Sequence, residues 1–416
     1  MPDTPKTEKF FSKPLIIIFV TVLIDLIGFG IVIPVLPYYV ESPEFGATPL
    51  ILGVLVASYS VMQFIFSPIL GGLSDKYGRR PVLFFSLLGT AAGFFIVGGA
   101  WTIWMIFAGR ILDGVTGGNI STAQAYIADV TTRKNRAKGM GLIGAAFGLG
   151  FVLGPAIGGV LSRWGAHVPF LFAGGLALAN AIGVYFYLPE SLPKEKRVAH
   201  APGGNRLLQI FDSLSDARFR SLSILYFLII TAFSIMTTSF ALYTQARFGY
   251  DAEQNGWLFA YIGIIAVLMQ GGIFGRLAHA IGESALVVIG SLMLAASLFL
   301  VPYVGPQWGG LVGLLAGMAF FAVGNSLCSP AIQSLASKAA GEHEQGKALG
   351  IMQSGASLAR AVGPFIAGIL LNTAAGKVSD HSLTVTFWTA AGIMFVAFVG
   401  AIVFARNAPE AEAAAA

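Results

Sequence analysis

The sequence predicts an all-α polytopic membrane protein in which twelve transmembrane helices form two pseudo-symmetric six-helix bundles. Three observations support this prediction: the composition, the spacing of apolar segments and an internal repeat. Of the 416 residues, 56% are hydrophobic and only 11% are charged. A soluble protein of this length needs more polar surface, so the chain belongs to the polytopic membrane class.

Twelve apolar segments are each long enough to cross about 30 Å of hydrocarbon as a helix. Most are separated by short turns, which favours antiparallel neighbouring helices. Their ranges are 15–39, 50–73, 82–99, 102–129, 138–162, 168–188, 219–246, 254–278, 284–304, 308–336, 346–373 and 383–405.

The basic residues orient these spans. With twelve spans both termini lie on one side, and that side carries 20 of the 25 Lys and Arg. The opposite loops hold Arg163, Arg247 and Lys377, while Arg110 and Arg360 lie inside spans. Positive residues accumulate in the cytoplasm, so we expect cytoplasmic termini and, given the short loops, a bacterial inner membrane. The net charge of +5 is thus spread over loops and does not indicate nucleic-acid binding.

A polar stretch divides the chain in two. It predicts an N-terminal half at 1–190, a cytoplasmic linker at 191–218 and a C-terminal half at 219–416, because the stretch is rich in charges, Pro and Gly. A short surface-lying helix is expected at 207–214. An interaction tail is the alternative interpretation of the linker.

The two halves repeat in sequence. Residues 138–159 align without a gap with 347–368, which pairs Gly154-Pro155 with Gly363-Pro364. Residues 71–78 align with 275–282, where His279 replaces Asp75. Internal repeats with a midplane site between them are typical of secondary transporters.

Several motifs resemble those of one transporter family. Residues 71–80, GGLSDKYGRR, resemble the loop signature of the major facilitator superfamily, and Arg110 resembles its intramembrane arginine. The glycines and proline of 144–159 resemble the span-five motif of its proton-coupled drug antiporters. With 25–37 and 247–249, the chain is similar to the tetracycline-efflux type. The resemblance implies the major facilitator fold and exchange of a small molecule for protons by alternating access.

The chain also departs from the tetracycline pumps. Where their pattern carries an acid in span three this chain has Gly93, where it carries one in span nine this chain has Leu294, and their span-eight histidine corresponds to Ala266. In that family those residues handle a metal-chelated drug and its exchanged proton. Their loss favours a different, more lipophilic, neutral or cationic compound.

Four ionisable residues lie deep within the spans: Asp25, Arg110, Asp113 and Arg360. Such groups are costly in a bilayer unless paired or protonated, so each is a functional candidate. We expect Asp25 to bind the coupling proton, with Arg110 and Asp113 as further members of the proton-coupling set. A fixed ion pair is the alternative, and Arg110 and Asp113 are spaced to neutralise each other on one helical face. Arg360 can pair with an acid or attract an anionic substrate.

Polar side chains within the spans are candidates for substrate binding, since a substrate pocket combines apolar walls with a few polar groups. Hydrogen bonding between helices is the alternative role for each. The predicted substrate-binding residues are Asn119, Gln124, Thr237, Tyr243, Asn325, Gln333 and Arg360.

The family resemblance assigns a gating role to the loop motif and to the paired Gly-Pro motifs. The predicted gating residues are Gly71, Asp75, Gly78, Arg79, Arg80, Gly154, Pro155, Gly363 and Pro364. Asp75 would lie at the cytoplasmic start of span eleven, where free N–H groups attract a carboxylate. A positive-inside anchor is the alternative for the basic residues of the loop.

The sequence therefore favours a proton-coupled antiporter that exports a small lipophilic or cationic compound, as in drug or multidrug efflux. A symporter or uniporter for a sugar, amino acid or organic anion is the alternative, as is a non-transporting membrane receptor. We do not expect an enzyme, because no soluble domain, P-loop, metal-ligand cluster or Ser-His-Asp set is found outside the predicted helices. We expect a monomer in lipid without a metal or cofactor, with the proton as coupling ion.

Overall fold

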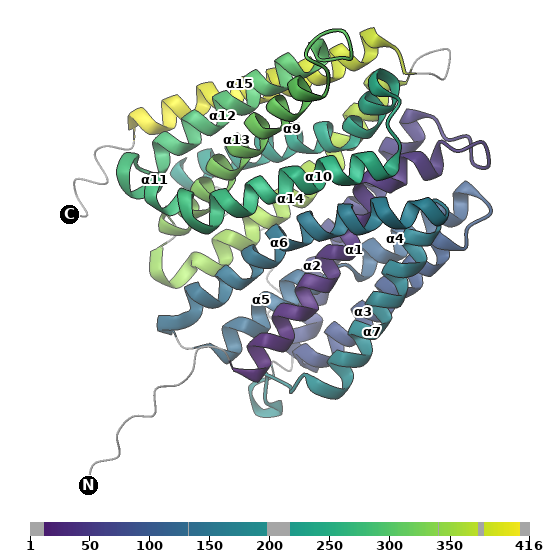
Figure 1. Cartoon of the computed structure of the whole chain (residues 1–416). Helices are drawn as coiled ribbons and strands as arrows, with labels where there is room; N and C mark the ends of the chain where they lie inside the picture. The colour runs from purple at the N-terminus through teal and green to yellow at the C-terminus, as the bar shows by residue number, and fades with distance from the viewer. Residues whose placement is uncertain (1–11, 132, 198–216, 340, 373–377, 408–416) are drawn as a thin grey trace.

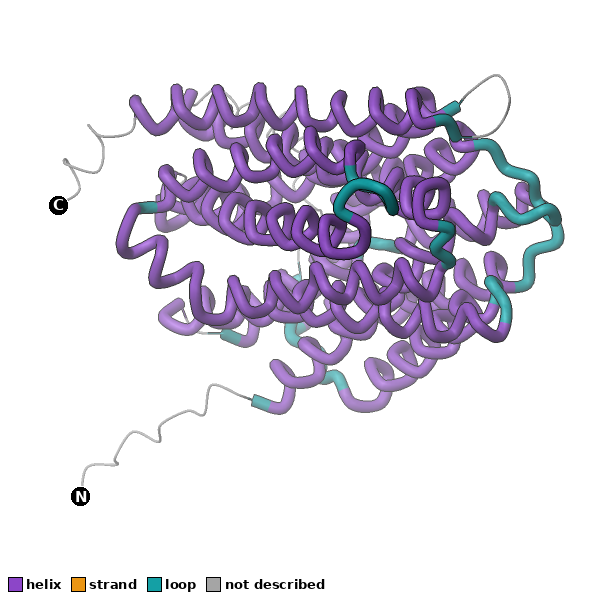
Figure 2. The backbone as a smooth tube through the Cα atoms, turned by 45° about the horizontal axis from the view of Figure 1, so that its top comes forward, coloured by secondary structure: helices purple, strands orange, loops and turns teal. Residues whose placement is uncertain are grey.

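The computed structural model describes residues 12–131, 133–197, 217–339, 341–372 and 378–407. Helices make up nearly all of these ranges (Figure 2), and no β-strand occurs within them. The predicted surface helix at 207–214 and most of the predicted linker lie outside the described residues. The predicted all-α fold class is confirmed.

The N-terminal half contains seven α-helices and one short 3₁₀ turn (Figure 1). In chain order they are α1 (Lys13–Val40), α2 (Pro49–Tyr77), α3 (Arg79–Gly98), α4 (Ile103–Thr116), α5 (Asn119–Val130), α6 (Arg133–Leu161), η1 (Ser162–Trp164) and α7 (Val168–Tyr187).

The C-terminal half follows the described part of the linker, which contains the turn η2 (Lys194–Lys196). Its elements are α9 (Ala217–Phe248), α10 (Ala252–Leu268), η3 (Met269–Ile273), α11 (Phe274–Ile281), α12 (Glu283–Leu300), η4 (Val301–Tyr303), α13 (Gly310–Ala339), α14 (Gly341–Leu371) and α15 (Asp380–Asn407).

Eleven spans in the described chain are long and apolar enough to cross a membrane unbroken. The twelfth predicted span, 102–129, is present as two shorter helices, α4 of 14 residues and α5 of 12 residues. The predicted span boundaries otherwise agree with the observed helices to within a few residues. Because the spans alternate in direction, α1 begins and α15 ends at the same end of the bundle, here called the terminal end (Figure 1). The opposite end is called the distal end.

The break between α4 and α5 falls at Gly117 and Gly118. Backbone that leaves a helix in a low-dielectric interior needs other hydrogen-bond partners. The side-chain amide of Gln63 on α2 supplies one, because its Nε2 donates to the Gly117 carbonyl oxygen at 3.1 Å. An added Cβ at Gly118 would lie 2.6 Å from a methyl carbon of Leu70, so a glycine is needed for this close approach.

Equivalent contacts to the backbone recur in each half. An added Cβ at Gly93 on α3 would lie 2.7 Å from the Gly109 carbonyl oxygen on α4, and the hydroxyl of Ser297, 204 positions later on α12, donates to the Gly317 carbonyl oxygen on α13 at 2.9 Å. Two tyrosines also match. Their hydroxyls donate over 3.0 Å to equivalent carbonyls, Tyr39 to Val97 and Tyr243 to Val301. The sequence repeat is therefore a repeat in three dimensions.

A π-helical turn interrupts the eighth span at η3. Before this turn, Gly53 and Gly256 make equivalent contacts and lie 203 positions apart. After it, Gly78 and Gly282 end the two corresponding spans and lie 204 positions apart. Both of the latter have positive φ, at 106° and 82°. The π-turn absorbs the one extra residue of the second half, which is the usual effect of a π-bulge.

The two halves meet along two symmetry-related helix pairs, α2 with α14 and α6 with α10. Glycines make both contacts close. Gly53 lies against the Pro364 carbonyl and Gly368, and Gly256 lies against the Pro155 carbonyl and Gly159. Figure 1 shows α6 and α10 side by side over their distal portions.

Polar contacts join the halves at the distal end. The Tyr38 hydroxyl on α1 donates to the Tyr250 carbonyl oxygen at 2.9 Å and accepts from the Asn255 amide at 2.5 Å. Arg163 forms a bidentate ion pair with Glu253 across the same interface.

Among the described residues, several glycines nearer the terminal end have open space beside them. Toward that end, an added Cβ at Gly141 or Gly144 on α6 would meet no atom within 4 Å, and the same holds for Gly350 and Gly355 on α14 and for Gly271 in the π-turn. Figure 1 shows the halves diverging toward the end where α1 begins. The described part of the interface is therefore closed at the distal end and more open toward the terminal end.

Gly53→Ala should destabilise this interface, because a methyl group there overlaps the Pro364 carbonyl oxygen. We expect a loss of about 1–3 kcal/mol, typical of overpacking. Gly72→Ala on the same helix is the control, since a Cβ there meets nothing within 4 Å. It should be neutral or stabilising by up to about 1 kcal/mol. Thermal unfolding of the purified variants in detergent measures both, and equal melting temperatures would contradict the packing argument.

Glu41 follows α1 at the distal end, outside the membrane-spanning segment. Its Oε1 atom is buried without a hydrogen-bond partner. Burial raises the pKa of this carboxyl from 4.5 to about 7. Between these two pH values the folded protein holds a proton on Glu41 that the unfolded chain has lost, so stability falls as pH rises through this window.

Glu41→Gln should remove that pH dependence. The wild type should lose about 2–3 kcal/mol of stability between pH 4.5 and pH 7 through this one group, and the variant should not. Melting temperatures of both proteins at pH 5 and pH 8 measure the effect, with the variant gaining most at pH 8. A constant difference at the two pH values would show that Glu41 does not titrate in this range.

Candidate functional site

A group of charged and polar side chains lies near the middle of the helices between the two halves. We call it the charged cluster; it consists of Asp25, Tyr59, Arg110, Asp113, Asn119 and Arg360. Asp25 is half-buried near the middle of α1. Its Oδ1 atom accepts a hydrogen bond of 2.8 Å from Nδ2 of Asn119, the first residue of α5. The α4–α5 break thus places Asn119 against the predicted proton site.

Arg110 and Asp113 form a buried ion pair within α4. Nη1 of Arg110 lies 2.8 Å from Oδ2 of Asp113, and the two residues are 3% and 5% exposed. The guanidinium carbon also lies 4.1 Å from the centroid of the Tyr59 ring, a cation–π contact. Arg110 is therefore bound to Asp113, whereas Asp25 is bound to Asn119; the structure does not pair Arg110 with Asp25.

Tyr59 on α2 connects the members of the cluster. It lies within electrostatic range of Asp25, Arg110, Asp113 and Arg360, and its hydroxyl accepts from Gln63 at 3.1 Å. Sequence reasoning missed Tyr59. A tyrosine in an apolar span usually indicates a packing role. Its position four residues before Gln63, on the same helical face, was the one sequence feature that indicated a polar role.

Arg360 on α14 differs from Arg110 in its surroundings. Its Nη2 donates to the Ser357 hydroxyl at 3.1 Å, and the Tyr59 and Tyr226 hydroxyl groups lie within electrostatic range. No acidic side chain among the described residues pairs with it. Of the two alternatives raised for Arg360, pairing with an acid is therefore not observed in this conformation.

The two halves differ at the cluster positions. Tyr39 and Tyr243 are equivalent at an offset of 204 residues, which places Ile229 opposite Asp25. Gly109 faces Val97 and Gly317 faces Val301, so the two glycines are equivalent at an offset of 208, which places Met318 and Phe321 opposite Arg110 and Asp113. Both deep acids thus belong to the N-terminal half.

Arg360 is the opposite case, because this deep charge belongs to the C-terminal half. The repeat that pairs Gly154 with Gly363 places Phe151 opposite Arg360. The C-terminal half therefore contributes a single cation at a position where the N-terminal half contributes an aromatic ring.

The other predicted substrate-binding residues are dispersed. Gln333 donates to the Tyr226 hydroxyl at 3.3 Å and so extends the polar surface near Arg360. Asn325 accepts from Ser329, Thr237 donates to the Ser234 carbonyl, and Gln124 is half-buried on α5. Tyr243 lies at the distal end: it is fully buried, and its hydroxyl bonds to the carbonyl oxygens of Val301 in η4 and of Val304, which follows η4.

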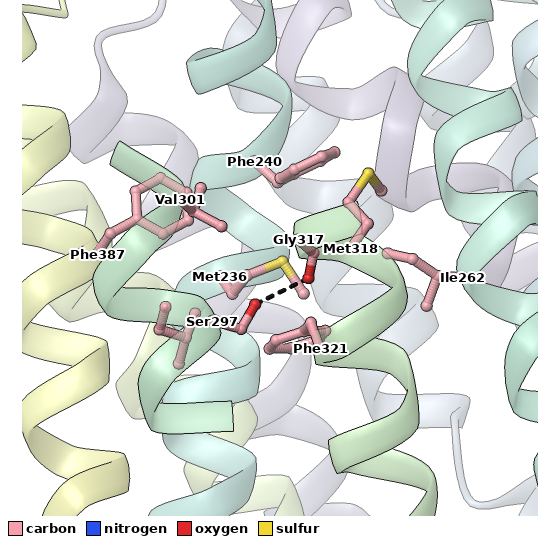
Figure 3. Close-up of a pocket in the computed structure, with 10 residues that line it drawn as sticks. Met236, Phe240, Ile262, Ser297, Val301, Gly317, Met318, Phe321 and Phe387 are labelled. Atoms are coloured by element: carbon pink, nitrogen blue, oxygen red, sulfur yellow. Dashed lines mark hydrogen bonds between the residues drawn. The ribbon is translucent and has the colours of Figure 1, made fainter. Parts of the chain in front are cut away.

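A small cavity of about 10 Å³ lies within the C-terminal half, away from the cluster (Figure 3). Apolar side chains such as Met236, Phe240 and Phe387 surround it, and its one polar side chain, Ser297, donates to the Gly317 carbonyl oxygen at 2.9 Å. This volume holds about one water molecule. It is a packing defect too small for a substrate.

Comparison with known proteins now identifies the family. The model of the major facilitator superfamily matches residues 18–343 and 273–416. The class H tetracycline resistance protein of Pasteurella multocida is 32% identical over 401 residues, covering 95% of this chain and 94% of the relative. The chain belongs to the major facilitator superfamily. It is therefore a multi-pass integral membrane transporter and not an enzyme.

Two further members of the superfamily show the breadth of the likeness. Multidrug resistance protein 2 of Bacillus subtilis is 30% identical and covers 86% of this chain and 88% of its own length. The crystal structure of the human organic anion transporter MFSD10 superposes with a TM-score of 0.72 at 27% identity, covering 94% of this chain and 99% of the other. The resemblance to the tetracycline-efflux type is confirmed.

The loop signature of the superfamily forms a charged network at the terminal end. Arg79 is 7% exposed and binds Asp75 at 2.6 Å and Asp129 of α5 at 3.1 Å. Glu190, after α7, accepts from the backbone N–H groups of Arg79 and Arg80 at 2.9 and 3.3 Å and so caps α3. Sequence reasoning missed Glu190.

Gly78 makes that cap possible. Its φ of 106° lies in the left-handed region, and a Cβ there would overlap the Glu190 carboxylate. The predicted partner of Asp75 is the start of span eleven. The side chains of 341–347, which form that start, lie outside the described residues. The predicted latch therefore stays a prediction.

The paired Gly-Pro motifs lie at the closed part of the interface. Gly154 packs on Gly30 of α1, and Gly363 packs on Ser234 of α9, while the carbonyls of Pro155 and Pro364 face the glycines of the opposite half. These residues therefore set the spacing between the halves.

The departure at Gly93 has a structural reason. An added Cβ would lie 2.7 Å from the Gly109 carbonyl oxygen and 3.0 Å from Cβ of Asp113. The position that carries an acid in the tetracycline pumps is here closed by the helix that holds Asp113. Leu294 is likewise buried, at 1% exposure.

Tyr59→Leu should destabilise the protein more than Tyr59→Phe. Phenylalanine keeps the ring face over Arg110 and loses only the hydrogen bond from Gln63, whereas leucine removes the cation–π contact. The difference should be about 0.5–2 kcal/mol. Thermal unfolding of the two variants measures it. Equal stability would mean that the ring does not stabilise the buried guanidinium.

Proposed function

We propose that this transporter is a proton-coupled antiporter that exports a small lipophilic compound by alternating access. It acts as a monomer in the bacterial inner membrane, with the terminal end in the cytoplasm and the proton as its coupling ion. No metal or other cofactor takes part. The kinship with tetracycline and multidrug resistance proteins supports efflux as the direction of transport.

One observation carries the proposal: Asp25 is a half-buried carboxylate, deep in a span, whose hydrogen-bond partner is a neutral amide. An ionised carboxylate without a cation is costly in a membrane interior, and protonation removes that cost. The other deep acid, Asp113, is already neutralised by Arg110. Asp25 is thus the acid best suited to take up and release a proton.

Asn119 couples that proton to conformation. It is the first residue of α5, whereas Asp25 belongs to α1, so a shift between these helices changes the hydrogen bond that stabilises the carboxylate. Rocking of the halves opens one end as it closes the other. The present state is open to the cytoplasm, and breaking the distal contacts of Tyr38 and Arg163 would open the opposite end.

The substrate is not determined by kinship, because the relatives are named for tetracycline, for several drugs and for organic anions. The departures at Gly93, Leu294 and Ala266 favour a compound other than metal-chelated tetracycline. The sequence favoured a lipophilic or cationic compound, and a cationic one is tested below.

Asp25→Asn should abolish proton exchange. In proteoliposomes with an acidic lumen and a pH-sensitive dye, a transported compound added outside should raise the luminal pH of the wild type. The variant should lose this response by at least tenfold, because an amide cannot carry a proton. Glu44→Gln, at an exposed distal acid, is the matched control and should respond like the wild type.

The same assay distinguishes the alternatives. A compound that lowers the luminal pH would indicate symport, and flux without a pH change would indicate a uniporter. Binding without flux would indicate a receptor. Proton exchange that persists unchanged in Asp25→Asn would overturn the assignment of Asp25.

A further inference from the structure

Arg360 is a deep cation that has no acidic partner among the residues that the structure describes. It lies within the span Ala348–Leu371, four residues before Pro364, at the interface of the halves. Its hydrogen-bond partner, Ser357, uses one of the five N–H donors of the guanidinium. Two tyrosines, Tyr59 from α2 and Tyr226 from α9, lie within electrostatic range of it.

The comparison with Arg110 shows what is missing. Arg110 has a carboxylate at 2.8 Å and an aromatic face at 4.1 Å, which together compensate a buried charge. Arg360 has neither a carboxylate among the described residues nor a ring stacked on its guanidinium. A cation in a membrane interior destabilises the protein unless an anion or another polar group pairs with it. Since Arg360 is half-buried rather than enclosed, a ligand can reach it.

A row of aromatic rings begins beside Arg360 and crosses between the halves. Neighbouring rings lie at centroid separations of 6.2, 6.2, 6.5 and 5.8 Å. In order, the rings are Tyr59, Phe29, Phe151, Phe233 and Phe321. Tyr59 is thus both a neighbour of Arg360 and the first ring of the row. This arrangement places an apolar, ring-lined surface next to an unpaired planar cation.

We propose that Arg360 binds the acidic group of the transported compound, and that the substrate class is an aromatic carboxylate or an aromatic compound of similar acidity. The guanidinium fork matches a carboxylate with two parallel hydrogen bonds, and the aromatic row takes the apolar part by offset or edge contacts. This inference rests on the proposed function for the transport direction, and names the substrate class of the same site.

Charge balance supports this class over a cationic one. The cluster offers a cation only one acid without a cationic partner, Asp25, which the proposed cycle needs for its proton. An anion binds at Arg360 without displacing an internal ion pair. Export of an anion in exchange for a proton also moves positive charge inward in both half-reactions, so a negative-inside membrane potential drives it.

Binding to the purified full-length protein in detergent tests the proposal. Three probes share one ring system and differ only in charge: 4-biphenylcarboxylate, 4-biphenylcarboxamide and 4-biphenylmethylamine. The wild type should bind the carboxylate most tightly. Arg360→Gln should weaken carboxylate binding about 10- to 100-fold, the effect of losing a charge-assisted pair, and leave the amide unchanged. Arg360→Lys should fall between these two.

Matched controls separate the site from general effects. Arg276→Gln, at an exposed arginine of α11, should bind all three probes like the wild type. A melting temperature for each variant shows that it is folded, and Arg360→Lys serves if the glutamine variant is not. Tighter binding of the amine than of the carboxylate by the wild type would overturn the proposal. So would an unchanged carboxylate preference in Arg360→Gln.

Asp25→Asn distinguishes this inference from the proposed function. The variant should keep its preference for the carboxylate even when proton exchange is lost, because Arg360 is intact. A carboxylate preference in a protein without proton exchange would refute the antiport and leave this inference standing. The double variant Asp25→Asn/Arg360→Gln gives a further test. If it bound the carboxylate as tightly as the wild type does, Arg360 would act as a partner of Asp25 rather than of a ligand, and the inference would fail.

Discussion

The close approach of glycine backbones between the two halves is the constraint on which the rest of the structure depends. In lipid, helices gain little from the hydrophobic effect when they associate, so small residues that allow close van der Waals packing decide where they meet. Gly53 with Gly368 and Gly159 with Gly256 provide such contacts in two symmetry-related places. Both lie distal to the charged cluster. The described contacts of these glycines thus hold the halves together on the distal side of the cluster.

Within this symmetric frame, the chemistry is asymmetric. The positions equivalent to Asp25, Arg110 and Asp113 hold Ile229, Met318 and Phe321, while Arg360 corresponds to Phe151. The acidic groups of the cluster are therefore concentrated in one half, and the other half contributes one cation across the interface. Such a division lets each half bring a different charge to a shared site. A movement between the halves then alters the environment of both charges together.

Much of the fold could be predicted from the sequence, because hydrophobic length, loop charge and the repeat at Gly154-Pro155 and Gly363-Pro364 are properties of single spans. The pairing within the cluster could not. Spacing on one helix predicted the contact of Arg110 with Asp113, but the hydrogen bond from Asn119 to Asp25 depends on how α5 packs on α1. Spacing could suggest the contact of Tyr59 with Gln63, but the contact of its ring with Arg110 and the cap that Glu190 forms on α3 depend on partners from other helices.

Two irregularities explain why hydropathy could not resolve the site. The α4–α5 break and the π-turn η3 each depart from a regular helix, and neither changes the apolar character of its span. The break puts the first residue of α5 beside the deep carboxylate of α1, which an unbroken helix would not do with the same register. The equivalent helix of the other half, α13, runs unbroken past the corresponding positions. The break therefore occurs in the half that holds both deep acids, where a hydrogen-bond donor that can move with α5 has a carboxylate to act upon.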